Sequence, residues 1–276
     1  MAVIPGSLVI EVCVDSVQSA VAAVKAGADR LEICANLGAG GGTTPSFGLL
    51  KSIQKVVPDI PLMVMIRPRI GDFLYSKDDI AVMLEDIRVF KDFGNIHGFV
   101  VGALTKEGRV DIECMQLIVD EILPLEICFH RAFDMTKDPV QALSDIADIG
   151  GISRILTSGH KPKAPDGLPL LKQLFQIRKE VVEDDVWGLT IMPGSGINSK
   201  TLPPLLDALL PLGLREVHLS GGKWVSGEMY FKQADMGMGI DQNTEWGVWR
   251  TEEDEVRKTK EIAKAVWEKN FSGAEK

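Results

Sequence analysis

The chain has 276 residues, of which 45% are hydrophobic and 25% are charged, as is typical of soluble globular proteins. Its formal net charge of −9 argues against general binding to nucleic acids or anionic membranes, because both require clustered positive charge. It lacks an apolar run of the roughly 18 to 20 residues that a membrane span needs, and its start lacks the features of a signal peptide. We therefore predict a cytosolic protein, with nuclear entry left open, that binds neither nucleic acid nor membrane.

Short apolar segments alternate with amphipathic segments along the whole chain. Glycine followed by a short polar turn joins helix to strand in KAGADRLEI, DIGGISRIL and PLGLREVHL. Helix starts are indicated by Ser76 with Asp79, by Asp138 before Pro139, and by Thr251 with Asp254. The predicted strands are 8–14, 30–34, 61–67, 98–104, 125–130, 154–158, 187–193 and 216–220. The predicted helices are 16–26, 46–57, 77–93, 111–122, 139–148, 168–182, 198–210 and 252–269.

Eight strands that alternate with eight helices predict a single α/β domain over residues 1–276, a TIM-like (β/α)₈ barrel with a C-terminal extension after strand eight. A doubly wound open sheet is the alternative. It is less favoured because VDSVQSA, which follows the first strand, contains no glycine fingerprint. The segment 222–250 is rich in tryptophan and methionine, and we expect it to cover the barrel or to contact another subunit.

Alternate strand residues point into a barrel, so the alternation selects candidate interior side chains. We expect Arg67 to neutralise the carboxylates of Glu11 and Glu32, since buried charges are costly unless paired. The polar interior is either a self-satisfied plug or a functional site. The expected inward-facing residues are Glu11, Cys13, Glu32, Cys34, Arg67, Cys128, His130 and His218.

These residue types permit two kinds of chemistry. If the protein is an enzyme, the catalytic candidates are Glu11, Glu32, Arg67 and His130, which combine acid–base groups with a guanidinium for an anion. If it binds a metal, the soft ligands of Cu(I) or zinc would come from Cys13, Cys34, Cys128 and His218. The remaining thiol, Cys114, is expected on a helix as a small apolar residue.

Glycine-rich loops follow the strands whose C-terminal ends often hold phosphate in barrels. We expect an anion site with a small anionic ligand there, and Arg69 after the third strand adds a cation. Arg131 and Asp134 lie at the rim after the fifth strand and are expected to have a structural role, with Arg131 forming ion pairs with Asp134 or with neighbouring loops. The anion-site candidates are Arg69, Ser158, Gly159, Gly194, Gly196, Ser220 and Gly221.

Several motifs in this order resemble the CutC family of copper-homeostasis proteins, over nearly the whole chain. They are EVCVDSVQSAVAAVKAGADRLEIC, GGTTPSFGLL, MVMIRPRIGDFLYS, FVVGALTKEGRVD, FHRAFD, RILTSG and VHLSG. The resemblance implies a TIM-like barrel, a homo-oligomer (dimer or tetramer), a cytosolic setting and Cu(I) as the bound ion. It also marks Cys34, in LEIC, as a metal candidate. The family pattern commonly has threonine at the position of Cys128.

Three functions follow as hypotheses. The first is a protein that buffers or traffics Cu(I). The second is a barrel enzyme acting on a small anionic or phosphorylated metabolite through Glu11, Glu32, Arg67 and His130. The third is a scaffold whose tryptophan-rich tail binds partners. The resemblance itself implies no reaction.

Overall fold

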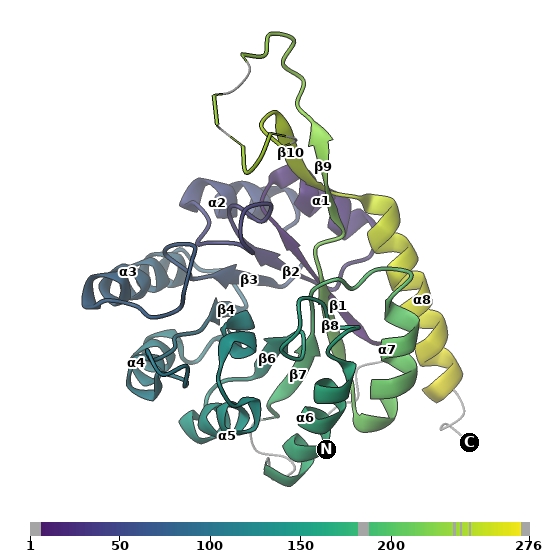
Figure 1. Cartoon of the computed structure of the whole chain (residues 1–276). Coiled ribbons are helices and arrows are strands. Elements are labelled where there is room, and N and C mark those ends of the chain that lie inside the picture. The colour runs from purple at the N-terminus through teal and green to yellow at the C-terminus, as the bar shows by residue number, and fades with distance from the viewer. Residues whose placement is uncertain (1–6, 182–187, 234–235, 238, 243, 272–276) are drawn as a thin grey trace.

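Eight parallel strands form a nearly closed barrel with helices around its outside (Figure 1). The computed structural model describes residues 7–181, 188–233, 236–237, 239–242 and 244–271. Adjacent strands pair in the order β7 to β1 and then β8, and β7 lies beside β8. This architecture confirms the predicted TIM-like barrel. The strands are β1 (Val9–Val14), β2 (Arg30–Ile33), β3 (Leu62–Met65), β4 (Gly98–Val101), β5 (Glu126–Phe129), β6 (Arg154–Thr157), β7 (Thr190–Pro193) and β8 (Glu216–Leu219).

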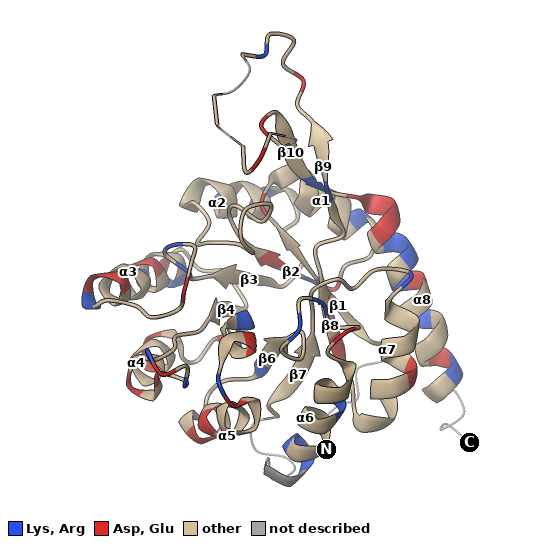
Figure 2. Cartoon of the chain, in the orientation of Figure 1, with Lys and Arg blue, Asp and Glu red and all other residues tan. Residues whose placement is uncertain are grey.

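The outer helices mix acidic and basic residues, as Figure 2 shows along α3 and α8. No helix in the described ranges is both long and apolar enough to cross a membrane. The helices are α1 (Val17–Lys25), α2 (Phe47–Val56), α3 (Lys77–Phe93), α4 (Ile112–Ile122), α5 (Pro139–Ile149), α6 (Leu168–Val181), α7 (Leu202–Leu209) and α8 (Glu253–Phe271), with 3₁₀ turns η1 (Arg131–Met135) and η2 (Leu210–Leu212).

Two of the three predicted helix starts are confirmed. Ser76 and Asp79 form a reciprocal capping box, and Asp138 caps the helix that begins at Pro139. The prediction for Thr251 is wrong. Thr251 ends a strand and its N–H donates to Ser19 Oγ, so the helix begins two residues later.

Several predicted boundaries also differ. The helix expected from residue 198 begins at Leu202, because Asn198 Oδ1 accepts from the N–H groups of Lys200 and Thr201 and holds a turn there. The expected end at residue 182 and the expected start at residue 187 lie outside the described residues. Several predicted strands run one to three residues too far at their C-terminal ends, where the chain turns into the loops of the mouth.

The segment 222–250 contains a hairpin that the sequence did not predict, formed by β9 (Gly222–Ser226) and β10 (Gly247–Thr251). Trp224 and Trp249 pack edge to face across it, with ring centroids 5.6 Å apart. Figure 1 shows the described parts of the connection between the two strands projecting away from the barrel. In that connection Tyr230 and Phe231 are exposed.

The barrel separates two apolar clusters. The larger cluster fills the layer between the strands and the helices and includes Ile10, Val12 and Ile33. The smaller cluster lies inside the barrel, as the alternation predicts, and is rich in sulfur. Its buried members are Cys13, Cys34, Met63, Met65, Val100, Cys128, Leu156 and Met192.

Paired charges fill the N-terminal part of the barrel interior. Arg30 forms ion pairs with Glu11 and Glu216, and Arg154 forms ion pairs with Glu216 and Glu126. This arrangement corrects the expectation that Arg67 neutralises Glu11 and Glu32, since Arg67 forms no ion pair with either carboxylate and Glu32 lies beside His218. The partner of Glu11 is Arg30, which the strand alternation also turns inward, since it precedes Glu32 by two positions.

We expect Arg30→Met to destabilise the protein by about 3–5 kcal/mol, because it removes the cation shared by the buried carboxylates of Glu11 and Glu216 and leaves Arg154 and His218 to offset their charges. Denaturant unfolding measures the change. The control is Arg257→Met on α8, whose ion pairs with Glu253 and Asp254 are at the surface. It should cost less than about 1 kcal/mol. Equal losses for the two variants would contradict this account of the barrel interior.

Candidate metal and ligand site

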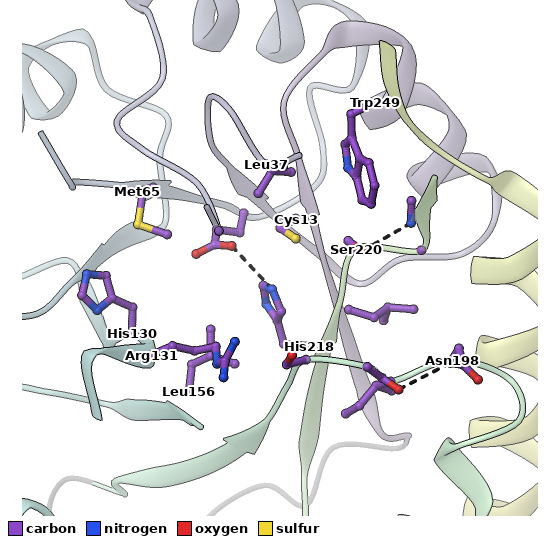
Figure 3. Close-up of a pocket in the computed structure, with 18 of the residues that line it drawn as sticks. Cys13, Leu37, Met65, His130, Arg131, Leu156, Asn198, His218, Ser220 and Trp249 are labelled. Carbon is purple, nitrogen blue, oxygen red and sulfur yellow. Dashed lines mark hydrogen bonds and ion pairs between the residues drawn. The ribbon is translucent and has the colours of Figure 1, made fainter. Parts of the chain in front are cut away.

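A cavity of about 760 Å³ opens at the C-terminal mouth of the barrel. Side chains from five of the strands reach its lower part, and the loops after β7 and β8 form one wall. Figure 3 shows Cys13 and His218 in the middle of this space, with Met65 and His130 on one side and Trp249 on the other. The position is the one at which barrels of this class place their functional groups.

The side chain of His218 is oriented by a carboxylate beneath it. Its Nδ1 is hydrogen-bonded to Glu11 Oε1 at 2.8 Å, and Glu11 is itself paired with Arg30. Burial would raise the pKa of Glu11, but Arg30 and His218 lower it below its usual range. Glu11 is therefore ionised, and His218 presents its Nε2 to the cavity.

Three buried side chains converge at the floor of the cavity. One ligand atom each from Cys13, Glu32 and His218 lies within 4.8 Å of the others, and Glu32 Oε2 is 3.6 Å from His218 Nε2. Glu32 Oε1 has no hydrogen-bond partner among the described residues. Thiolate, carboxylate and imidazole are all metal ligands, and the carboxylate on Nδ1 is the usual outer partner of a metal-bound histidine. The arrangement therefore fits a metal ion.

Without a metal this group holds protons. Burial raises the pKa of Glu32 to about 7 and that of the Cys13 thiol above its ordinary value. Burial would lower the pKa of His218, but the surrounding Cys13, Glu32 and Glu11 raise it well above its usual value. A metal ion would therefore displace protons on binding.

The other expected thiol ligands lie outside this three-residue group. Cys34 and Cys128 are fully buried in the sulfur-rich interior and do not line the cavity. Burial raises the pKa of both thiols well above the ordinary value. Cys114 is packed in the outer core from α4, as expected. All four cysteines are free thiols.

Arg67 holds a loop. Its Nη1 donates to the carbonyl oxygens of Gly40 and Gly42 at 2.7 and 2.8 Å, and its Nη2 donates to Gly71 at 3.2 Å. Its guanidinium also lies 5.0 Å from the ring centre of Phe73. These contacts fix the glycine-rich loop over the barrel, and two of the guanidinium nitrogens are used in doing so.

His130 lies between β5 and the 3₁₀ turn η1, which it caps at the N-terminal end, and it is 3% exposed. Its Nδ1 accepts a hydrogen bond from the Ala132 N–H at 3.2 Å, and its Nε2 has no partner among the described residues. Burial lowers the pKa of His130 to about 3, and the nearby Arg67 charge contributes in the same direction. The imidazole is neutral at physiological pH.

The loops expected to bind an anion are partly filled by the chain's own carboxylates. Asp134 accepts hydrogen bonds from the N–H groups of Ser158 and His160, and it pairs with Arg131 at 2.8 Å as predicted. Glu255 accepts from the N–H of Ser199 at 2.7 Å. Two of the loop ends that would suit phosphate are thus satisfied internally.

Some of the remaining anion-site candidates line the cavity, and others are packed against neighbouring residues outside it. Ser220, Gly221 and Gly196 line the cavity, whereas Gly159 packs against Gly167. Gly194 lies against His218 and Leu156, where a Cβ would be 2.5 Å from Leu156 Cδ1. Arg69 is outside the cavity and pairs with Asp72 on its own loop and with Asp79 in the first turn of α3.

Sequence reasoning missed several groups that line the cavity, among them Met65 and Trp249. Met65 lines the cavity from β3, and its position two residues before Arg67 could have indicated that it faces inward. Trp249 reaches the cavity from β10, and its indole Nε1 has no partner among the described residues. Segment 222–250 was expected to cover the barrel or to contact another subunit, but the sequence did not indicate which of its side chains would reach the cavity.

The fold and the site define a (β/α)₈-barrel protein with an organic-ligand-sized cavity above a buried thiol–carboxylate–imidazole group. Residues 8–223 match the CutC family. The chain belongs to this family.

Relatives were found in animals and bacteria. The chain is 42% identical to the copper homeostasis protein cutC homolog of Homo sapiens, over 93% of this chain and 89% of that protein. It is 40% identical to a family protein CutC of Pasteurella multocida, over 91% and 97%. A crystal structure of the putative copper homeostasis protein CutC from Streptococcus agalactiae superposes with a TM-score of 0.68 at 27% identity, covering 77% of this chain and 98% of that one.

We expect the pH dependence of stability to change in His130→Gln. The pKa of His130 is lower in the folded state, about 3, than its ordinary 6.5, so protonation of the unfolded chain removes stability as pH falls below about 6.5. By pH 5 the wild type should have lost about 2 kcal/mol of its free energy of unfolding through this protonation, and the variant should not show that part of the loss. Chemical denaturation of the metal-free proteins at pH 7 and pH 5 measures the two free energies of unfolding. Parallel losses in both proteins would contradict a buried neutral imidazole.

Proposed function

We propose that this protein binds Cu(I) at Cys13, Glu32 and His218 and thereby buffers or traffics copper. The observation that carries the proposal is the convergence of these three ligand atoms at the floor of the cavity. Copper is favoured as the ion because relatives at about 40% identity are named copper homeostasis proteins. A thiol with an imidazole suits Cu(I), and the thioether of Met65 lines the same cavity.

The chemistry of the site supports reversible binding. A buried group whose ligands hold protons exchanges them for a metal ion, so affinity depends on pH. The cavity is open to solvent at the mouth, which gives an ion a route to the thiol. Arg30 and Glu11 hold His218 in the orientation in which Nε2 is available, which lowers the cost of assembling the ligands.

The alternative of an enzyme that acts on a small anionic metabolite loses part of its support. Glu11 is engaged by Arg30 and His218, and two guanidinium nitrogens of Arg67 are engaged by loop carbonyls. Of the four catalytic candidates, Glu32, Arg67 and His130 each keep one buried atom without a hydrogen-bond partner among the described residues, and all three line the cavity.

We expect Cys13→Ser to weaken Cu(I) binding by about tenfold or more, because a hydroxyl is a poor ligand for a soft ion. A titration under reducing conditions with a competing chelator measures the affinity. Cys114→Ser is the matched control, since that thiol is also buried but lies in the outer core. Unchanged affinity in Cys13→Ser, or tighter binding of zinc than of Cu(I), would count against the proposal.

The same titration should show affinity rising between about pH 6 and about pH 8. The pKa values of Glu32, Cys13 and His218 are all raised, so each proton must leave before its atom can bind the ion. Calorimetry in two buffers of different ionisation enthalpy counts the protons released. Binding that releases no proton would place the ion elsewhere.

A further inference from the structure

The cavity is much larger than a metal ion requires. Its volume of about 760 Å³ falls within the range of sites that bind small organic molecules. The three proposed metal ligands occupy only its floor, whereas Met65, Leu156 and Leu37 give it apolar walls. A second ligand therefore has both room and a surface to contact.

Three buried N–H donors of this cavity, His130 Nε2, Arg67 Nε and Trp249 Nε1, have no acceptor among the described residues. His130 accepts from Ala132 through Nδ1, which therefore carries no proton, so the neutral ring carries its proton on Nε2. That N–H has no partner among the described residues, although the side chain is 97% buried, and His130 lines the cavity. A buried donor left unpaired is costly, and an acceptor on a ligand would satisfy it.

A buried positive charge lies beside His130. Arg67 is 6% exposed and forms no ion pair with any described carboxylate, and its guanidinium contacts neutral carbonyls and the Phe73 ring. The acids on the rim are already engaged, since Asp134 pairs with Arg131 and Glu252 pairs with Lys223. The field at His130 therefore favours an anionic acceptor.

The kind of anion is indicated by the hydrogen-bond donors around the cavity that are not used within the protein. Phosphate is usually held by several backbone N–H groups at once. Here Asp134 already accepts from Ser158 and His160, and Glu255 accepts from Ser199. What remains beside His130 is its Nε2–H, the Arg67 guanidinium with its unpaired Nε–H, and apolar walls, while the unpaired indole N–H of Trp249 lies on the opposite side of the cavity (Figure 3). These features suit a carboxylate on a small apolar skeleton better than a phosphate.

We propose that the cavity binds a small organic carboxylate, with the carboxylate beside His130 Nε2 and Arg67 and the apolar body against Met65, Leu156 and Leu37. The carboxylate of the ligand accepts a hydrogen bond from His130 Nε2–H and offsets the positive charge of Arg67. The proposal does not depend on copper, because none of these five residues belongs to the Cys13–Glu32–His218 group.

The test compares three probes on the full-length protein in the presence of a chelator: isobutyrate, isobutyramide and inorganic phosphate. Isobutyrate and isobutyramide share a skeleton and differ in charge. We expect saturable binding of isobutyrate by ligand-detected NMR, with the other two at least about tenfold weaker, the lower end of what one hydrogen bond to a charged group contributes. No saturable isobutyrate binding, or equal binding of phosphate or the amide, would overturn the proposal.

Variants locate the binding. His130→Phe should weaken isobutyrate binding by about tenfold or more, whereas His130→Gln, which keeps an N–H donor, should retain part of it. The matched control is His97→Phe, because His97 pairs with Glu126 and lies outside the cavity. Unchanged binding in folded His130→Phe would overturn the proposal. If His130→Phe does not fold, the comparison of probes on the wild type decides alone.

Discussion

The hydrogen bond between Glu11 and His218 is the contact on which the organisation of the barrel interior depends. On one side of it, Arg30 holds the Glu11 carboxylate ionised and links it to Glu216 and the rest of the buried charge network. On the other side, the contact occupies His218 Nδ1 and leaves Nε2 facing Glu32. A structural ion-pair network is thus continuous with the group that we propose to bind metal, and a charge change in one must alter the other.

The interior is divided by depth. Paired arginines and glutamates fill the end where the strands begin, thiols and thioethers fill the middle, and the cavity opens where the strands end. The sulfur-containing side chains of low polarity therefore lie between the layer of ion pairs and the solvent-accessible cavity. It explains why the pKa values of the thiols and of Glu32 are raised while Glu11, which touches Arg30, stays ionised.

The fold and the inward-facing residues could be predicted from the sequence because both depend on periodicity. Strand alternation placed Glu11, Cys13 and Glu32 on one face, and the barrel architecture brought His218 to them. The ion-pair partner of Glu11 could not be predicted, because the register between neighbouring strands decides whether Glu11 lies beside Arg30 or Arg67. The β9–β10 hairpin was missed because its strands lie in a segment whose mixed apolar and polar residues show no clear period, and its position over the mouth depends on packing of Trp224 against Trp249 and the loop at Gly38.

Anomalous diffraction at the copper edge, from crystals of the protein loaded with Cu(I) under reducing conditions, tests the central claim most directly. The account predicts one dominant peak within bonding distance of Cys13 Sγ and His218 Nε2, with His218 Nδ1 still hydrogen-bonded to Glu11. A dominant peak in the sulfur-rich interior at Cys34 and Cys128, or on the projecting connection between β9 and β10, with the Cys13–Glu32–His218 group empty, would contradict it.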